Sequence, residues 1–190
     1  MKEHLEAGGL VVYPTSTLPG LGCLPISKGL DNLFDCKKRS KSMPVSLGVA
    51  SMSQVENLVT IPKFVYNLLN SFPKGSLTLI LPAIKKMDER LGGEFVAIRV
   101  FSHPEAIKLA TSFGPITATS ANESGSQSEC NTAIAAKILG VEFFVDGLCP
   151  NEKGSTIIKL VNEKSNWSLT IMREGVVPSA DVMEWWTSQT

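Results

Sequence analysis

The chain has 190 residues, a formal net charge of zero and an apolar fraction of 43%. These values exclude an intrinsically disordered protein, which needs low hydrophobicity and high net charge. They also exclude a domain that holds nucleic acid mainly by neutralising phosphates, which needs an excess of cations. A chain of this length suits one domain, so we expect a single domain over residues 1–190.

Neither a membrane segment nor a metal site is expected. No window approaches the roughly 18 consecutive apolar residues of a membrane-spanning helix, and the charged N-terminus has no signal-peptide core. The four cysteines are Cys23, Cys36, Cys130 and Cys149, which form no Cys-x-x-Cys pair and have only two histidines to join them. A zinc site or a disulfide framework is therefore not expected. We predict a cytoplasmic protein with reduced thiols.

Apolar runs and helical spacings alternate along the first three quarters of the chain. In chain order they predict a strand at 10–13, a loop at 14–25, a helix around 30–34 and a strand at 45–49. Helices are then expected after the capping box Ser53-x-x-Glu56 and after Pro62. Strands follow at 77–81 and 95–100, then a helix after the capping box Ser102-x-x-Glu105. A strand at 116–119, a polar loop at 120–129, a helix at 134–139 and a strand at 142–145 complete this part.

The C-terminal part has a different pattern. Residues 156–161 and 167–172 predict a hairpin about the turn 162–166, and Ser179 predicts the cap of a last helix. The alternation suggests parallel strands, and the hairpin adds antiparallel ones. We therefore predict an α/β fold with a mixed sheet and flanking helices.

Polar groups stand in four places where a core or a plain turn would not require them. Hydroxyls at 15–17 and the run 119–125 each follow a buried strand, Lys37 and Arg39 end a helix, and Arg99 lies inside an apolar strand. In α/β sheets, ligands bind at the carboxyl ends of strands, and Arg and Lys bind phosphates and carboxylates. Each feature also has an ordinary explanation: surface hydroxyls, cations at a helix C-terminus, an Asx turn, or an arginine that reaches solvent.

The order of these features resembles the YrdC/TsaC family. The resemblance rests on Tyr13-Pro-Thr-Ser-Thr, Gly20-Leu-Gly, Lys37-x-Arg39 with Pro44 five residues on, Leu77-Thr78, Arg99, Thr119-Ser-Ala-Asn-x-Ser-Gly125, Asp146-Gly147, Gly154-Ser-Thr-Ile157 and Arg173-x-Gly175. It runs from about Gly9 to about Gly175, and the chain is similar to the short members that lack a second domain. The resemblance implies a twisted sheet around a concave cavity.

The resemblance also implies an activity. Such proteins are L-threonylcarbamoyladenylate synthases, which join L-threonine, bicarbonate or CO2 and ATP, release pyrophosphate, and supply a separate transferase that makes N6-threonylcarbamoyladenosine in tRNA. By position, the residues that would bind ATP are Lys37, Arg39, Asn122 and Arg173, and the first two would be catalytic. The residues that would bind threonine are Thr17, Arg99, Ser120 and Ser155. Mg²⁺ would arrive with ATP, and no dedicated protein metal site is predicted.

Several positions depart from the family pattern. Leu18-Pro19 replaces a usual aromatic residue in the first loop, which predicts a reshaped cavity wall. Gly48 stands where some members have histidine, and Phe101 stands where proline is usual. Lys74, Ser76 and Lys159 also differ. Two alternatives stay open: an RNA-binding or ribosome-associated module that uses the same concavity, and a paralogue that acts on another carbamoyl compound. Direct RNA binding is not favoured by the neutral charge.

Overall fold

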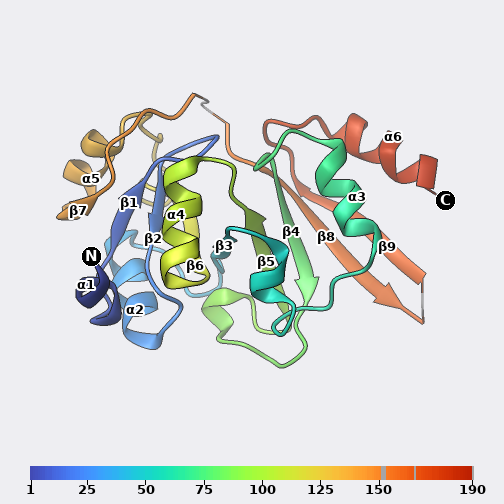
Figure 1. Ribbon diagram of the computed structural model, residues 1–190, viewed down its shortest axis with the longest axis horizontal. Coiled ribbons are helices and arrows are strands. Elements are labelled where there is room, and N and C mark those ends of the chain that lie inside the picture. Colours follow the sequence, from blue (N-terminus) through green and yellow to red (C-terminus); the bar gives the residue numbers. More distant parts are fainter. Residues whose placement is uncertain (151–152, 165, 190) are drawn as a thin grey trace.

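The computed structural model describes residues 1–150, 153–164 and 166–189. Within these residues the strands form one sheet of nine, in the order β7-β1-β2-β6-β3-β5-β4-β8-β9 (Figure 1). The strands are β1 (Val11–Tyr13), β2 (Gly20–Gly22), β3 (Ser46–Val49), β4 (Leu77–Pro82), β5 (Phe95–Val100), β6 (Ile116–Ser120), β7 (Phe143–Phe144), β8 (Thr156–Glu163) and β9 (Asn166–Arg173).

Strand directions are mixed, as predicted. β1 with β7, β3 with β5 and β4 with β8 are parallel pairs, and the other neighbouring pairs are antiparallel. The predicted C-terminal hairpin is the antiparallel pair β8–β9. Ser165, in its predicted turn, lies outside the described residues. The α/β fold with a large mixed sheet is confirmed.

The helices flank this sheet. They are α1 (Lys2–Glu6), α2 (Ser27–Cys36), α3 (Phe64–Ser71), α4 (Pro104–Phe113), α5 (Thr132–Leu139) and α6 (Ser179–Gln189), with single 3₁₀ turns η1 (Met52–Val55) and η2 (Glu89–Leu91). Among the described residues, no helix is long and apolar enough to cross a bilayer.

Two apolar clusters form the core. The larger one contains the strand residues Leu79 and Ile98 together with side chains of α2, α3, α5 and α6. The smaller one packs α4 against Tyr13 and Phe101. Because side chains alternate along a strand, the neighbours of these core residues in β4 and β5 face the other side of the sheet.

The sequence did not predict strand β2, because residues 14–25 were expected to form one loop. Its two glycines have no strand preference of their own. They are required because the ring of Tyr13 packs on β2: a Cβ on Gly20 would lie 2.6 Å from Tyr13 Cζ, and one on Gly22 would lie 2.8 Å from Tyr13 Cε1. Pairing with β1 and β6, rather than local propensity, makes this segment a strand.

Both predicted capping boxes were wrong. Ser53 lies within η1, a single 3₁₀ turn, and its hydroxyl is hydrogen-bonded to Ser51. Ser102 donates instead to the Lys74 carbonyl, and His103 caps α4 by accepting a hydrogen bond from the Glu105 amide. The helix after Ser102 does form, but the one after Ser53 does not.

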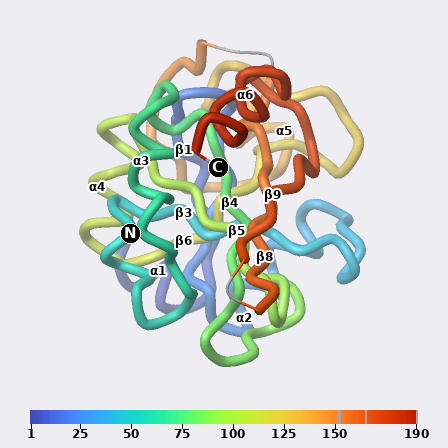
Figure 2. The backbone as a smooth tube through the Cα atoms, turned by 90° about the vertical axis from the view of Figure 1, so that its right-hand side faces the viewer, coloured from blue at the N-terminus to red at the C-terminus, as the bar shows by residue number. Residues whose placement is uncertain are grey.

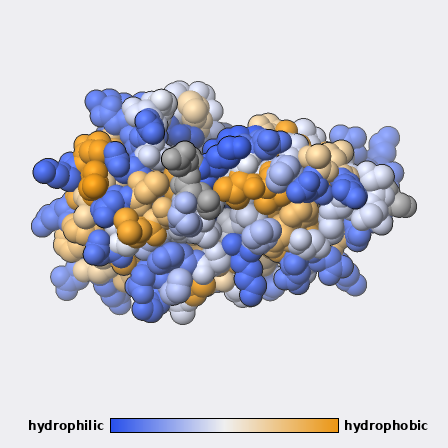
Figure 3. Space-filling view, turned by 90° about the horizontal axis from the view of Figure 1, so that it is seen from above, coloured by the Kyte–Doolittle hydropathy of each residue, from blue (hydrophilic) through white to orange (hydrophobic). Residues whose placement is uncertain are grey.

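A helix covers the sheet at the end formed by β8 and β9, whereas apolar side chains are exposed at the end formed by α5 and β7. Figure 2 views the end where α6 lies against the β8–β9 hairpin, and Trp185 of α6 donates to Ser71 of α3 (2.8 Å). At the opposite end, Ile138 of α5 is 60% exposed and Leu148, which follows β7, is 71% exposed. Figure 3 shows strongly hydrophobic side chains at that end and also near the middle of the same face.

Candidate functional site

A cavity of about 260 Å³ opens on the face of the sheet opposite the larger core cluster. Neighbouring strands contribute alternate residues to it, as expected for side chains that share one face. The lining includes Tyr13, Thr15, Thr17, Leu18, Pro19, Arg39, Ser46, Thr78, Ala97, Arg99, Ala118, Ser120, Ser155 and Arg173. Six of the eight predicted site residues are in this lining, which contains three arginines and no acidic residue.

Arg99 is held inside the sheet by the first loop. It is 9% exposed, its Nη2 donates to Thr17 Oγ1 (2.7 Å), and its Nε donates to the carbonyl of Gly75 (3.1 Å). Burial lowers the pKa of the guanidinium to about 10, so it is still charged at neutral pH. The structure therefore rules out an arginine that reaches solvent and places this cation in the cavity wall.

Thr17 is positioned by its own loop. The Thr17 amide donates to Thr15 Oγ1 (3.1 Å), whose hydroxyl donates to the Leu18 carbonyl (2.7 Å). Thr15 and Thr17 are each 2% exposed. This hydroxyl-stabilised turn directs Thr17 toward Arg99, which explains why hydroxyl residues follow a buried strand here.

Arg39 and Arg173 are two further cations of the lining; Arg39 is half-buried, and Arg173 is exposed at its edge. Arg39 donates to the carbonyls of Met43 (Nε, 2.6 Å) and Pro44 (Nη2, 3.1 Å). Arg173 donates to the carbonyl of Ser155 (2.8 Å). Burial lowers the pKa of both guanidinium groups, and the charge of Arg173 adds to the effect on Arg39. Like charges are thus held near one another without an acidic partner among the described residues.

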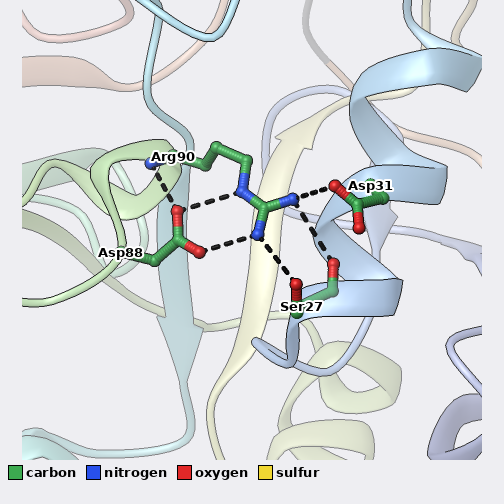
Figure 4. Close-up of polar contacts among 4 residues, drawn as sticks. All are labelled: Ser27, Asp31, Asp88 and Arg90. Atoms are coloured by element: carbon green, nitrogen blue, oxygen red, sulfur yellow. Dashed lines mark hydrogen bonds and ion pairs between the residues drawn. The ribbon is translucent and has the colours of Figure 1, made fainter.

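Arg90, which lies outside the cavity, is paired with carboxylates and serves as a comparison for the cavity arginines. Its guanidinium pairs with both carboxylate oxygens of Asp88, with Asp31 and with Ser27 of α2 (Figure 4). Hydrogen bonding to Asp88 is the main cause that raises its pKa. A buried cation without a counterion is costly, because desolvation is not offset. Of the four arginines, all of them among the described residues, Arg39, Arg99 and Arg173 lack such carboxylates, which indicates that the cavity receives an anion from outside.

Lys37 lies beside the cavity rather than in its wall. It is 1% exposed, and its ammonium donates to the carbonyls of Ser120 and Asn122. Burial, with the nearby charge of Arg39, lowers its pKa to about 8. The side chain of Asn122 accepts from Ser120 Oγ (2.5 Å) and also lies outside the lining. In this structure Lys37 fixes the loop after β6, and the phosphate-binding roles predicted for Lys37 and Asn122 stay predictions.

Ser155 enters the lining from the residue before β8. Its hydroxyl is 2.7 Å from the hydroxyl of Thr78 in β4, and the residue is 5% exposed. Thr78 and Ser46 were not predicted as site residues, although both line the cavity. Thr78 was part of the family pattern and is a single hydroxyl in an otherwise apolar strand, but the sequence assigned it no role. The parallel pairing of β4 with β8 is what brings Thr78 to Ser155.

Gly48 and Phe101, two of the departures from the family pattern, are in direct contact in the structure. Gly48 of β3 lies opposite Arg99 of β5, and the ring of Phe101 occupies the space above it. A Cβ on Gly48 would lie 1.9 Å from Phe101 Cζ. The same ring packs edge-on against Tyr13, at 5.6 Å between centroids. The predicted change in the first loop also reaches the site, because Leu18 and Pro19 line the cavity.

The described residues contain no group of three or more His, Cys, Asp or Glu side chains that could hold a metal ion. The cavity lining offers hydroxyls and carbonyls but no carboxylate. Mg²⁺ prefers one or two carboxylates together with substrate phosphates. These residues alone therefore do not fit a resident Mg²⁺ ion.

Comparison with known proteins identifies the family. Residues 3–175 match the Sua5/YciO/YrdC family, described as telomere recombination, and the chain belongs to that family. A putative threonylcarbamoyl-AMP synthase of Mycobacterium tuberculosis is 32% identical over 187 residues, with 95% of this chain and 84% of the relative covered. One of Methanocaldococcus jannaschii is 29% identical over 182 residues, covering 94% of this chain and 85% of the relative.

Solved structures show the same fold. Sua5 of Pyrococcus abyssi, crystallised with L-threonine, superposes with a TM-score of 0.84 at 31% identity, covering 96% of this chain and 55% of that one. YciO of Escherichia coli superposes with a TM-score of 0.78 at 24% identity, covering 93% and 87%. The recognition of the family from the sequence is thus confirmed.

Proposed function

We propose that this protein is a threonylcarbamoyl-AMP synthase, which makes L-threonylcarbamoyladenylate and pyrophosphate from L-threonine, bicarbonate or CO2, and ATP. The observation that carries the proposal is the acid-free cavity with Arg39, Arg99 and Arg173 in its wall. The names of the relatives and the threonine-bound Sua5 structure support it. They favour it over an RNA-binding module. The product would supply a separate transferase that modifies tRNA, and cytoplasmic location stays a prediction.

Threonine fits the Arg99 side of the cavity. A carboxylate would provide the counterion that Arg99 lacks, through the planar fork of the guanidinium. The hydroxyls of Thr17, Ser155 and Thr78 lie along the same wall and can pair with the substrate's ammonium or hydroxyl group. A site that hydrogen-bonds a substrate hydroxyl strongly rejects analogues without one. We therefore assign threonine to Thr17, Arg99, Ser120 and Ser155.

ATP fits the side formed by Arg39 and Arg173. Guanidinium groups bind phosphate oxygens in a bidentate manner. Lys37 holds the loop of Ser120 and Asn122 in place, so it supports this side even where it does not touch phosphate. Mg²⁺ would enter on the phosphates of ATP, where it would neutralise charge on the departing pyrophosphate.

The chemistry needs cations more than a protein base. The threonine amine adds to CO2 and loses a proton, which gives a carbamate. A carbamate oxygen then attacks the α-phosphorus of ATP, the bond to the β-phosphate oxygen breaks, and pyrophosphate leaves. Tyr13 cannot serve as the base, because burial raises its pKa far above neutral. Fixed positive charge near the reacting anions lowers the barrier, since it needs no rearrangement as the reaction proceeds.

The test is pyrophosphate release from ATP, Mg²⁺ and bicarbonate with and without L-threonine. Threonine-dependent release, together with a product that has the mass of threonylcarbamoyl-AMP, is expected. Serine and 2-aminobutyrate are the matched substrates, because they lack the methyl group and the hydroxyl group of threonine respectively. Release that is independent of threonine, or faster with 2-aminobutyrate, would refute the proposal.

A further inference from the structure

Cys130 and Cys149 face each other across a short antiparallel bridge. Asn131 pairs with Leu148 in this bridge. The amide of Cys149 donates to the carbonyl of Cys130 (2.8 Å), and the amide of Thr132 donates to the carbonyl of Gly147 (3.1 Å). This register places the two cysteines opposite each other, joined by one backbone hydrogen bond, although they are 19 positions apart in the sequence.

Such a position suits a disulfide. Opposed residues of an antiparallel hydrogen-bonded pair have Cα atoms about 5.5 Å apart and side chains on the same face. A disulfide requires Cα atoms about 4.4–6.8 Å apart and Cβ atoms directed toward each other. Both thiols are free in this structure. Burial raises the pKa of the Cys149 thiol, and the proximity of Cys130 adds to this.

The two thiols differ in access. Cys130 is half-buried, whereas Cys149 is 4% exposed. An external oxidant therefore meets Cys130 first, and Cys149 lies where a second thiol must be to complete a disulfide. Cys36, also half-buried, serves as a comparison because its sulfur contacts the carbonyl of Leu139 and no thiol.

Cys149 also touches the cavity loop. The amide of Thr15 donates to Cys149 Sγ (3.4 Å). Thr15 in turn anchors the amide of Thr17, and Thr17 accepts the hydrogen bond from Arg99. A sulfur drawn toward Cys130 would leave the Thr15 amide buried without its acceptor, which is an unfavourable state.

We propose that Cys130 and Cys149 are a redox-active thiol pair, which a low-molecular-weight disulfide oxidises to an intramolecular disulfide that loosens the Thr15–Thr17 turn. The thiolate of Cys130 attacks one sulfur of the external disulfide, whose S–S bond breaks and releases one thiolate. The thiolate of Cys149 then attacks the sulfur of Cys130 and expels the second. The protein loses two electrons and two protons, and the external disulfide is reduced to two thiols. The consequence for threonine rests on the proposed function, but disulfide formation does not.

The experiment treats the native full chain with excess oxidised glutathione and maps the peptides by mass. We expect a Cys130–Cys149 peptide pair that has lost two hydrogen atoms, and faster amide exchange at Thr15. Cys130→Ser should show neither change, and Cys36→Ser should behave as the unaltered chain. Absence of the linked peptides after equilibration, or equally faster Thr15 exchange in Cys130→Ser after the same treatment, would overturn the proposal. These readouts need no catalysis, so they stand apart from a failure of the proposed function.

The effect on the site is measured in the same samples. Loss of one neutral hydrogen bond that supports the loop corresponds to about a 2- to 10-fold weaker use of threonine. The Michaelis constant for threonine should rise by that factor on oxidation and return with dithiothreitol, whereas Cys130→Ser should not respond. An oxidised protein with unchanged threonine kinetics and unchanged Thr15 exchange would contradict the link to the cavity.

Discussion

Replacing Arg99 with methionine should remove recognition of the threonine carboxylate while leaving the fold intact. Methionine keeps a long unbranched side chain in the strand but removes the guanidinium and its charge. A hydrogen bond to a charged group contributes about 1.5–3 kcal/mol, which corresponds to about a 10- to 150-fold rise in the Michaelis constant for threonine. The Michaelis constant for ATP should change far less, because Arg39 and Arg173 remain.

Stability should not fall with this change. Burial lowers the pKa of Arg99 from 12.5 to about 10, and at about 1.4 kcal/mol per unit this disfavours the folded cation by about 3 kcal/mol. The cost is fully present at neutral pH, where the group is protonated in both the folded and the unfolded chain. Losing the hydrogen bonds to Thr17 and Gly75 offsets part of the gain. The melting temperature of Arg99→Met should therefore stay within a few degrees of the unaltered protein or rise.

The assay is threonine-dependent pyrophosphate release, with threoninol as a second substrate because it lacks only the carboxylate. The unaltered protein should prefer threonine over threoninol by the 10- to 150-fold factor, and Arg99→Met should lose that preference. Lys108→Met, at an exposed cation of α4, is the matched control and should keep it. A preserved preference in Arg99→Met would refute the role assigned to Arg99.

Three further changes test other parts of the structure. At neutral pH, Lys37→Met should change the melting temperature by only a few degrees, because the hydrogen bonds lost at the carbonyls of Ser120 and Asn122 are offset by removal of a buried cation. Burial lowers the Lys37 pKa from 10.5 to about 8, so between pH 8 and 10 the folded chain binds fewer protons there than the unfolded chain, and scans over this range should show the unaltered protein gaining stability relative to the variant. Arg90→Met should destabilise by about 1–3 kcal/mol in denaturant titrations, because it removes the charged hydrogen bonds to Asp31 and Asp88 while both partly exposed carboxylates can still be hydrated. Gly48→Ala should cost about 1–3 kcal/mol and be partly rescued in the double variant with Phe101→Leu; additive losses would contradict their contact.

The sequence predicted most elements because their signals are local. The apolar run 95–100 and the Thr-Ser-Ala-Asn segment after 116–119 indicate strands and a polar strand end without knowledge of the fold. Strand β2 and the capping boxes were mispredicted because glycine and serine carry no preference strong enough to outweigh tertiary contacts. Only glycine fits at position 20 of β2, because a Cβ there would clash with the ring of Tyr13. Ser102 does not cap a helix, because its hydroxyl donates to the carbonyl of Lys74.

For the candidate site, too, the sequence predicted the local features and the tertiary structure decided the long-range ones. The residue types, their order and the family resemblance together predicted an anion-binding site with Arg39, Arg99 and Arg173, and these three do line one cavity. Only the tertiary structure separated them from Arg90, because a carboxylate partner is invisible until the chain brings Asp31 and Asp88 to it. It also decided that Lys37 turns inward and that Thr78 meets Ser155. The sequence thus determined which groups are available for chemistry, and long-range strand pairing determined which of them share one desolvated space.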